Sequence, residues 1–220
     1  MLDELAFSAA PRGELADTAW LGWRASLLEA VGKLRDPRAV PVLRAAVSRG
    51  PAERLLVAAA AGALGKLLTE DEARWLVARL PAVTGEARLG LLQGLGHCRR
   101  GVAAEALAAA LTAAPGDEEA RVLARALGTV GSSWAWRTPV VAASGEEDAV
   151  RGTAARALAG AWMLYRGQAQ KTIGHALLVV AHTDTAALLR MAVTDGDEDT
   201  RSAAEELIRR FEDRSFRGEP

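Results

Sequence analysis

Apolar residues recur along this chain at helical spacing, and a glycine stands at a fixed point in most copies of the pattern. In LLEAVGKL (Leu27–Leu34), apolar residues lie one, four and five positions before Gly32. This spacing puts them on one face of an α-helix and predicts a helix with a single buried face. Because a glycine inside a helix costs about 1 kcal/mol relative to alanine, we expect its recurrence to have a packing reason.

The same pattern returns five more times. The glycine is kept in AAGALGKL, LLQGLGHC and LARALGTV, while AARALAGA has alanine and AAEELIRR has isoleucine in its place. The equivalent positions are 32, 65, 96, 128, 159 and 208, with four steps of 31 to 33 residues and a last step of 49. A period of this size is typical of repeat proteins whose units stack in a row.

A second set of helix patterns lies between these copies, as in RAVPVLRAAV, DEARWLVARL, VAAEALAAAL and TAALLRMAV. The connections carry turn-forming residues, as in SRGP, VTGE, PGDE, SGEE and DGDE. Acidic residues follow the glycine in most of them, where they can cap the next helix. The repeating unit is therefore predicted to be two antiparallel helices.

Two segments depart from this plan. The first, GSSWAWRTPVV, has two tryptophans and Pro139 where a regular helix is due, and we expect an irregular repeat near 131–145. The second falls in the 49-residue step, where we expect an extra helix near 166–182. Departures from a repeat template are better places to look for function than the template itself.

The units resemble HEAT repeats, and most closely the short bacterial variety first noted in phycobilisome lyase-like proteins. The resemblance extends from about Ala19 to Phe211 and is carried best by DPRAVPVL, AAGALGKL and DEDTRSAAEEL. It implies an all-α fold, an α-solenoid of about five to six two-helix repeats, as a single domain over 1–220. It also implies that the glycine-bearing helices line a concave face. In the family, an arginine near the start of these helices braces the preceding acidic turn, here Arg24, Arg88, Arg121, Arg151 and Arg201.

Residues three positions before and one after the equivalent point lie four apart, so they form one exposed stripe along the concave face. The middle of the stripe carries cations and no acid. We therefore expect a mildly cationic groove for an acidic peptide or protein surface. A solvated face without any partner explains the same stripe equally well. The residues expected to bind the partner are Lys66, Gln93, His97, Arg125 and Arg156.

The tryptophans divide into core candidates and surface candidates. Trp23 and Trp162 fall at apolar positions and are expected in the core. Trp134 and Trp136 would lie about 200° apart on a helix, so both cannot be central to one buried face. Because tryptophan is enriched at interface hot spots, we expect a second partner-binding edge at Trp134, Trp136 and Arg137, with Trp136 and Arg137 as the anchor.

The composition excludes several chemistries. Basic and acidic residues nearly balance, 27 against 28, so a strongly basic nucleic-acid footprint is absent. Cys98 is the only cysteine, which excludes disulfides and thiolate metal cages. His175 and His182 lie two helical turns apart, about 10 Å, too far to hold one metal ion, and are interpreted as structural. No catalytic residue, metal site or cofactor is therefore predicted.

The location and source are inferred from weaker signals. The segment MLDELAFSAAPRG is acidic and lacks the pattern of a secretory signal, and no apolar run is long enough for a membrane span. We therefore expect a cytoplasmic protein without membrane contact. Only three of the 27 basic residues are lysines, which indicates a GC-rich, bacterial genome.

These observations predict a non-catalytic adaptor or scaffold that holds a protein partner on a concave face. The alternative is a HEAT-like nucleic-acid-binding protein or an enzyme similar to the alkylpurine DNA glycosylases that such repeats also build. The stripe holds only a few cations, and no tryptophan–aspartate constellation is evident. A DNA-binding protein would lose affinity steeply with rising salt, which separates the two hypotheses.

Overall fold

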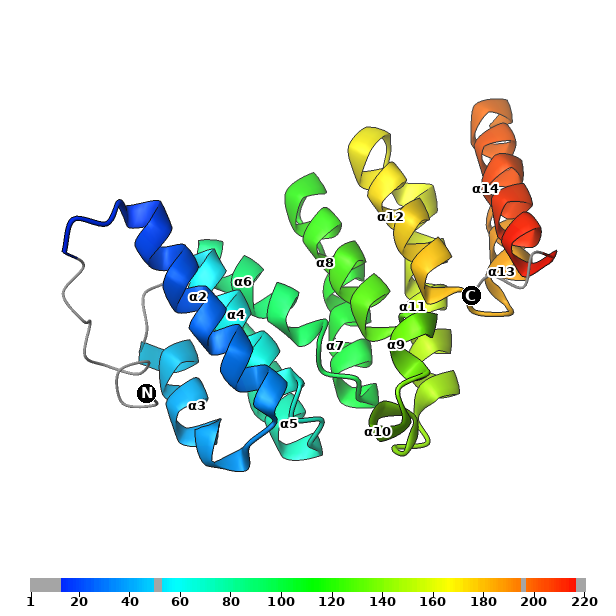
Figure 1. The fold of residues 1–220 in the computed structure, drawn as a ribbon. Helices are drawn as coiled ribbons and strands as arrows, with labels where there is room; N and C mark the ends of the chain where they lie inside the picture. Colours follow the sequence, from blue (N-terminus) through cyan, green and yellow to red (C-terminus); the bar gives the residue numbers. More distant parts are fainter. Residues whose placement is uncertain (1–12, 50–52, 195–196, 217–220) are drawn as a thin grey trace. The chain divides into compact units, whose positions relative to one another are not determined.

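The structure is a computed structural model that describes residues 13–49, 53–194 and 197–216 (Figure 1). Within these ranges every regular element is a helix and none is a strand, which confirms the predicted all-α class. The chain divides into two compact units, Met1–Ala103 and Ala104–Pro220.

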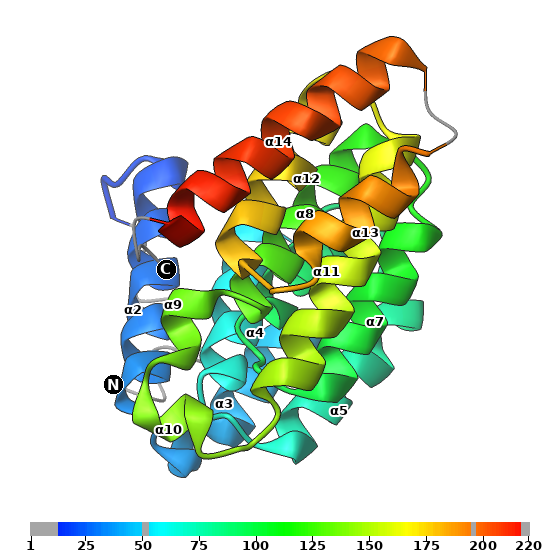
Figure 2. The same cartoon turned by 90° about the vertical axis from the view of Figure 1, so that its right-hand side faces the viewer.

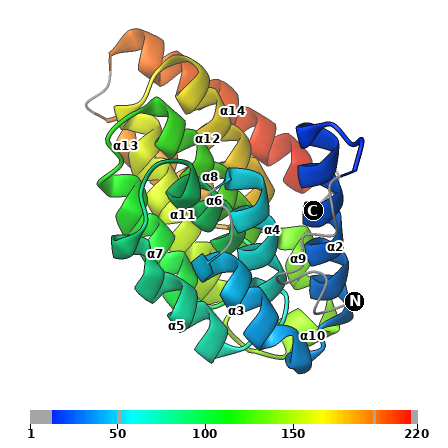
Figure 3. The same cartoon turned by 90° about the vertical axis from the view of Figure 1, so that its left-hand side faces the viewer.

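In the first unit, α4 lies between α2 and α6, and α3 and α5 pack on this row (Figures 1 and 3). Leu64 and Leu95, each one position before an equivalent point of the repeat, are fully buried, as the apolar pattern predicts. The elements are α2 (Asp17–Leu34), η1 (Pro37–Ala39), α3 (Val40–Arg49), α4 (Arg54–Gly65), α5 (Glu70–Arg79), η2 (Leu80–Ala82) and α6 (Gly85–Leu95).

Glycines lie where the helices of this row touch, among them Gly32, which belongs to the recurrent set, and Gly90, which does not. A Cβ added at Gly32 of α2 would come within 2.6 Å of the Ala63 Cα in α4. A Cβ at Gly90 of α6 would come within 2.6 Å of the carbonyl oxygen of Arg54. Only a hydrogen atom fits at these points, so close packing of neighbouring helices explains why the glycines are present.

A polar contact joins α3 to α5 at the edge of the row. The Arg44 guanidinium donates to both carboxylate oxygens of Glu72, each at 2.8 Å, and Glu72 is buried. Two guanidinium carbons lie near the centroid of the Trp75 ring, that of Arg44 at 5.1 Å and that of Arg79 at 4.7 Å. Bidentate pairing fixes both the distance and the orientation of the two helices.

In the second unit, α12 packs on both α8 and α11, while α13 packs on α11 and α14 (Figure 2). Two four-residue helices, α9 and α10, fill the segment in which an irregular repeat is expected. The elements from the unit boundary onward are α7 (Gly101–Thr112), α8 (Asp117–Val130), α9 (Ser133–Trp136), α10 (Pro139–Ala142), α11 (Glu147–Leu164), α12 (Gly167–Val180), α13 (Thr185–Ala192) and α14 (Glu198–Phe216).

The structure corrects the repeat alignment in this unit. The sequence aligns Ala159 of α11 with Gly128 of α8, but the more extensive neighbour of α8 is α12. A Cβ at Gly128 would lie 3.2 Å from the Ala176 Cβ. In α8, the fully buried Leu127 stands one position before Gly128. In α12, the fully buried Leu177 stands one position before Leu178, so Leu178 is the residue of α12 that is equivalent to Gly128. Both α11 and α12 carry the apolar pattern, and only packing decides between them.

Candidate functional site

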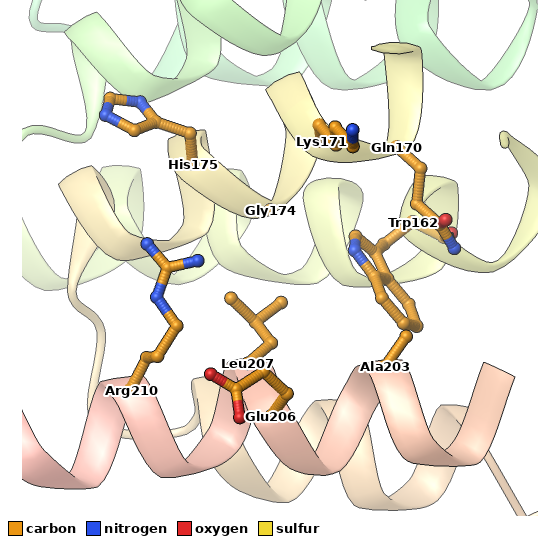
Figure 4. A pocket seen from close by; sticks show the side chains of 9 residues that line it. All are labelled: Trp162, Gln170, Lys171, Gly174, His175, Ala203, Glu206, Leu207 and Arg210. Atoms are coloured by element: carbon orange, nitrogen blue, oxygen red, sulfur yellow. The ribbon is translucent and has the colours of Figure 1, made fainter. Parts of the chain in front are cut away.

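A cleft of about 500 Å³ opens in the second unit between α12 and α14 (Figure 4). In the first unit, neighbouring helices of the row pack closely against each other at glycine positions. Here α14 packs mainly on α13 and leaves one face of α12 uncovered. The cleft is lined by Trp162 of α11, by Gln170, Lys171, Gly174 and His175 of α12, and by Ala203, Glu206, Leu207 and Arg210 of α14.

The floor of the cleft is apolar. Trp162 and Leu207 are both buried, and a Cβ added at Gly174 would lie 3.3 Å from the Trp162 Nε1 and 3.6 Å from the Leu207 Cδ2. Because Gly174 has no side chain, the edge of the largely buried indole can line the cleft. No acceptor for the Trp162 Nε1–H occurs in the part of the chain that the structure describes. An apolar floor with one spare donor is typical of a binding pocket.

The rim of the cleft is cationic. Lys171 and His175 stand four residues apart on α12, and Arg210 extends from α14 toward the His175 side (Figure 4). Within the described ranges, Lys171 and Arg210 form no ion pair with any carboxylate. The one acidic residue of the lining, Glu206, pairs with Arg209 at 2.8 Å. The rim therefore carries positive charge that the fold does not neutralise.

Other arginines of this unit stabilise helix ends instead. The Arg151 guanidinium donates to the carbonyl oxygens of Val180 (3.1 Å) and Ala181 (2.6 Å), and to Glu147 at 2.8 Å. These carbonyls belong to the last turn and cap of α12, where a cation is favourable. Arg151 thus has a structural role, unlike the two cations of the cleft.

Three residues of the predicted stripe lie together in the first unit. Lys66, Gln93 and His97 line a small cavity of about 50 Å³ with Glu29. The His97 ring packs over Gly62, and burial, aided by the charges of Lys66 and Arg99, lowers the pKa of His97 to about 4. His97 is therefore neutral at pH 7. This corrects the expectation that it adds positive charge to the groove.

Arg99 and Arg35 are cations near this cavity that the repeat pattern does not single out. Arg99 Nε is buried and has no hydrogen-bond partner among the described residues. Burial lowers the pKa of Arg99, and the nearby charge of Arg35 lowers it further. In the sequence, the two arginines of HCRR are the signal that could have pointed to Arg99. Arg99 lies outside the predicted stripe.

The second half of the predicted stripe is not continuous. Arg125 is exposed on α8, but the next helix of this layer is α12, where His175 holds the place that the alignment gives to Arg156. Arg156 lies on α11, where its guanidinium donates to Thr153 Oγ1 at 3.4 Å. The structure therefore replaces Arg156 in the stripe with a residue that lines the cleft.

The two tryptophans of the predicted edge differ in exposure. Trp136 is only 1% exposed, and its Nε1–H donates to the Val130 carbonyl at 2.9 Å, so it cannot be the anchor. Trp134 is 70% exposed, with the Arg137 guanidinium 5.7 Å from its ring centroid. The expected assignment of the two rings was reversed because α9 is too short for its helical phase to follow from sequence.

The prediction that Trp23 belongs to the core is wrong. Its side chain is 45% exposed and stacks on Trp20, with ring centroids 5.1 Å apart. Trp23 lies nine residues before Gly32, which is about 180° around the helix from the glycine that faces α4. Trp162 is buried as expected, and its edge lines the cleft.

Cys98 and His182 are the other candidate reactive side chains that the sequence singles out. Cys98 is buried, and burial raises the pKa of its thiol to about 12, so it does not act as a nucleophile at neutral pH. The described ranges contain no cluster of three His, Cys, Asp or Glu side chains that could hold a metal ion. His182 is buried, and its ring nitrogens contact Asp148 and the backbone N–H of Asp184.

No protein-family model matches this chain, and no curated protein matches it. Among the helices of the described ranges, none combines the length and apolar character needed to cross a bilayer.

Proposed function

We propose that this chain is a non-catalytic protein-binding module of a cytoplasmic adaptor, built as an α-solenoid of HEAT-like two-helix repeats. The glycine contacts between α2, α4 and α6, and the small-residue contact between α8 and α12, support this architecture. An acidic surface on the bound protein would complement Lys171 and Arg210, which form no ion pair with a carboxylate in the described ranges.

The observation that carries the proposal is the α12–α14 cleft. It combines a buried tryptophan, an apolar floor and two cations, Lys171 and Arg210, that pair with no carboxylate in the described ranges. Buried aromatic and arginine anchors dominate the energetics of protein interfaces, while charge complementarity sets association rate and specificity. Among the described residues that line the cleft, none is a serine, threonine or cysteine.

Affinity capture from a nuclease-treated lysate of the source organism tests the proposal. We expect a protein retained by the wild type to be lost with the variant Lys171→Glu/Arg210→Glu. It should be kept by Lys66→Glu/Arg125→Glu, which changes the charge equally at the predicted stripe. The variant Trp134→Ala tests the exposed edge at Trp134 and Arg137, because loss of the retained protein with this variant would place the contact there. If no protein is retained specifically, or retention requires nucleic acid, the adaptor function is overturned and the DNA-binding alternative leads.

A further inference from the structure

The helix pair α12 and α14 is held apart where other pairs of its kind are closed. A Cβ at Gly32 would clash with the backbone of α4, and a Cβ at Gly128 would press on Ala176. At Gly174 the nearest atom of α14 is the end of the flexible Leu207 side chain, at 3.6 Å. The Leu207 side chain thus spans the gap at Gly174, and the cleft of about 500 Å³ is the part of the gap that remains open.

Each wall of the gap presents one face of a helix. On α14, Ala203, Glu206, Leu207 and Arg210 follow the i, i+3, i+4, i+7 pattern of one helical face. On α12, Lys171, Gly174 and His175 occupy one turn. A groove with an apolar floor between two such faces is suited to a segment that inserts apolar side chains and keeps its polar groups at the rim.

The charge of the groove selects among such segments. Lys171 and Arg210 have no carboxylate partner in the described ranges, while Glu206 is occupied by Arg209. A neutral apolar segment would leave both cations without compensation, whereas a segment with carboxylate side chains would neutralise them. The Trp162 Nε1–H supplies one further donor at the floor.

We propose that the α12–α14 groove binds an acidic segment of a partner protein, with a leucine or phenylalanine against Trp162 and Leu207 and glutamate or aspartate side chains on Lys171 and Arg210. This inference rests on the proposed protein-binding function and specifies its ligand. The aromatic floor supplies affinity, and the two cations select against neutral segments.

The test uses the full chain and two peptides, acetyl-Glu-Leu-Phe-Glu-amide and its isostere acetyl-Gln-Leu-Phe-Gln-amide. The indole N–H signals of the ¹⁵N-labelled protein report binding, and the Trp162→Phe variant identifies the Trp162 signal. We expect the glutamate peptide to shift that signal and to bind roughly ten-fold more tightly than the glutamine peptide. A hydrogen bond to the Trp162 N–H would move its proton signal downfield.

Matched variants separate the groove from a general charge effect. Lys171→Gln/Arg210→Gln should remove the preference for the glutamate peptide, while Lys33→Gln/Arg74→Gln, which removes two exposed charges elsewhere, should leave it intact. Ala203→Phe fills the groove from an exposed position without changing charge and should weaken both peptides at least ten-fold. Circular dichroism of each variant checks that the helices are retained.

Five results would overturn the inference. Equal binding of the two peptides would show that charge does not select the ligand. A shift confined to the other indole signals would show that the peptide binds elsewhere on the protein. Equally tight binding of N-acetylphenylalanine would indicate a small-molecule carboxylate site. A concentration-dependent Trp162 signal without peptide would indicate a second copy of the chain as occupant. If the lysate partner is lost only with the Lys66 and Arg125 substitutions, the adaptor function stands and this inference alone fails.

Discussion

Gly128 of α8 faces Ala176 of α12, so closely that a Cβ at residue 128 would lie 3.2 Å from the Ala176 methyl carbon. The contact has the same character as that of Gly32 with Ala63 in the first unit, where a glycine again meets an alanine. It identifies α12 as the helix that follows α8 in packing. The cleft that α12 forms with α14 is consequently the point at which close packing of this layer stops.

Substitution of a contact glycine should destabilise the fold, whereas substitution of a free one should not. Gly32→Ala brings a methyl group within 2.6 Å of backbone in α4, so we expect a loss of about 1–3 kcal/mol in the free energy of unfolding. Gly160→Ala meets nothing within 4 Å and should gain about 0.5–1 kcal/mol from helix propensity. Urea denaturation measures both, and equal changes in the two variants would contradict the packing explanation.

Removal of Glu72 should cost more than removal of an exposed acid on the same helix. Glu72→Ala leaves Arg44 without its bidentate partner, and we expect a loss of about 1–3 kcal/mol. Glu70→Ala breaks the pair with Arg74 on the surface and should cost about 0.5 kcal/mol or less. A double-mutant cycle with Arg44→Met gives the coupling energy, which should be larger than that of the Arg74 pair.

His97 should make the protein less stable as the solution becomes acidic. Because burial lowers its pKa in the folded state to about 4 from a usual 6.5, the unfolded chain takes up this proton first as the pH falls. The His97 contribution is fully present above pH 6.5 and is lost as the pH falls toward 4, by up to roughly 3 kcal/mol.

Unfolding experiments across this pH range measure the loss, and His97→Gln should reduce the slope. An NMR titration of the His97 ring protons gives the folded-state pKa directly. A midpoint near 6.5 would show that the ring is solvated and would remove the predicted effect.

The two neighbouring tryptophans of α9 should respond oppositely to substitution. Trp136→Ala opens a cavity in the core and leaves the Val130 carbonyl without its donor, so we expect a loss of about 3–5 kcal/mol. Trp134→Ala removes an exposed ring and should change stability by at most about 0.5 kcal/mol. Thermal unfolding of both variants decides the matter, and a large effect at Trp134 would contradict the assignment.

The local pattern of the chain predicted much of the fold. The all-α class, the buried helix faces and a packing role for Gly32 all follow from residue spacing, because a buried helix face needs apolar residues every three to four positions. The solenoid arrangement and the HEAT resemblance remain predictions. Leu64, Leu95 and Leu127, each at the predicted interior position, are fully buried.

Only the tertiary structure decided which helices pack against each other and which side chains therefore stay exposed. The apolar pattern fits α11 and α12 equally well, so it placed Arg156 of α11 in the exposed stripe where the packing places His175 of α12. It also gave no indication that Lys171, His175 and Arg210 line one cleft. It likewise exchanged Trp134 with Trp136. An amphipathic helix specifies that one face is covered but not which neighbour covers it, because apolar contacts are non-directional and their partner is set by the packing of the whole unit.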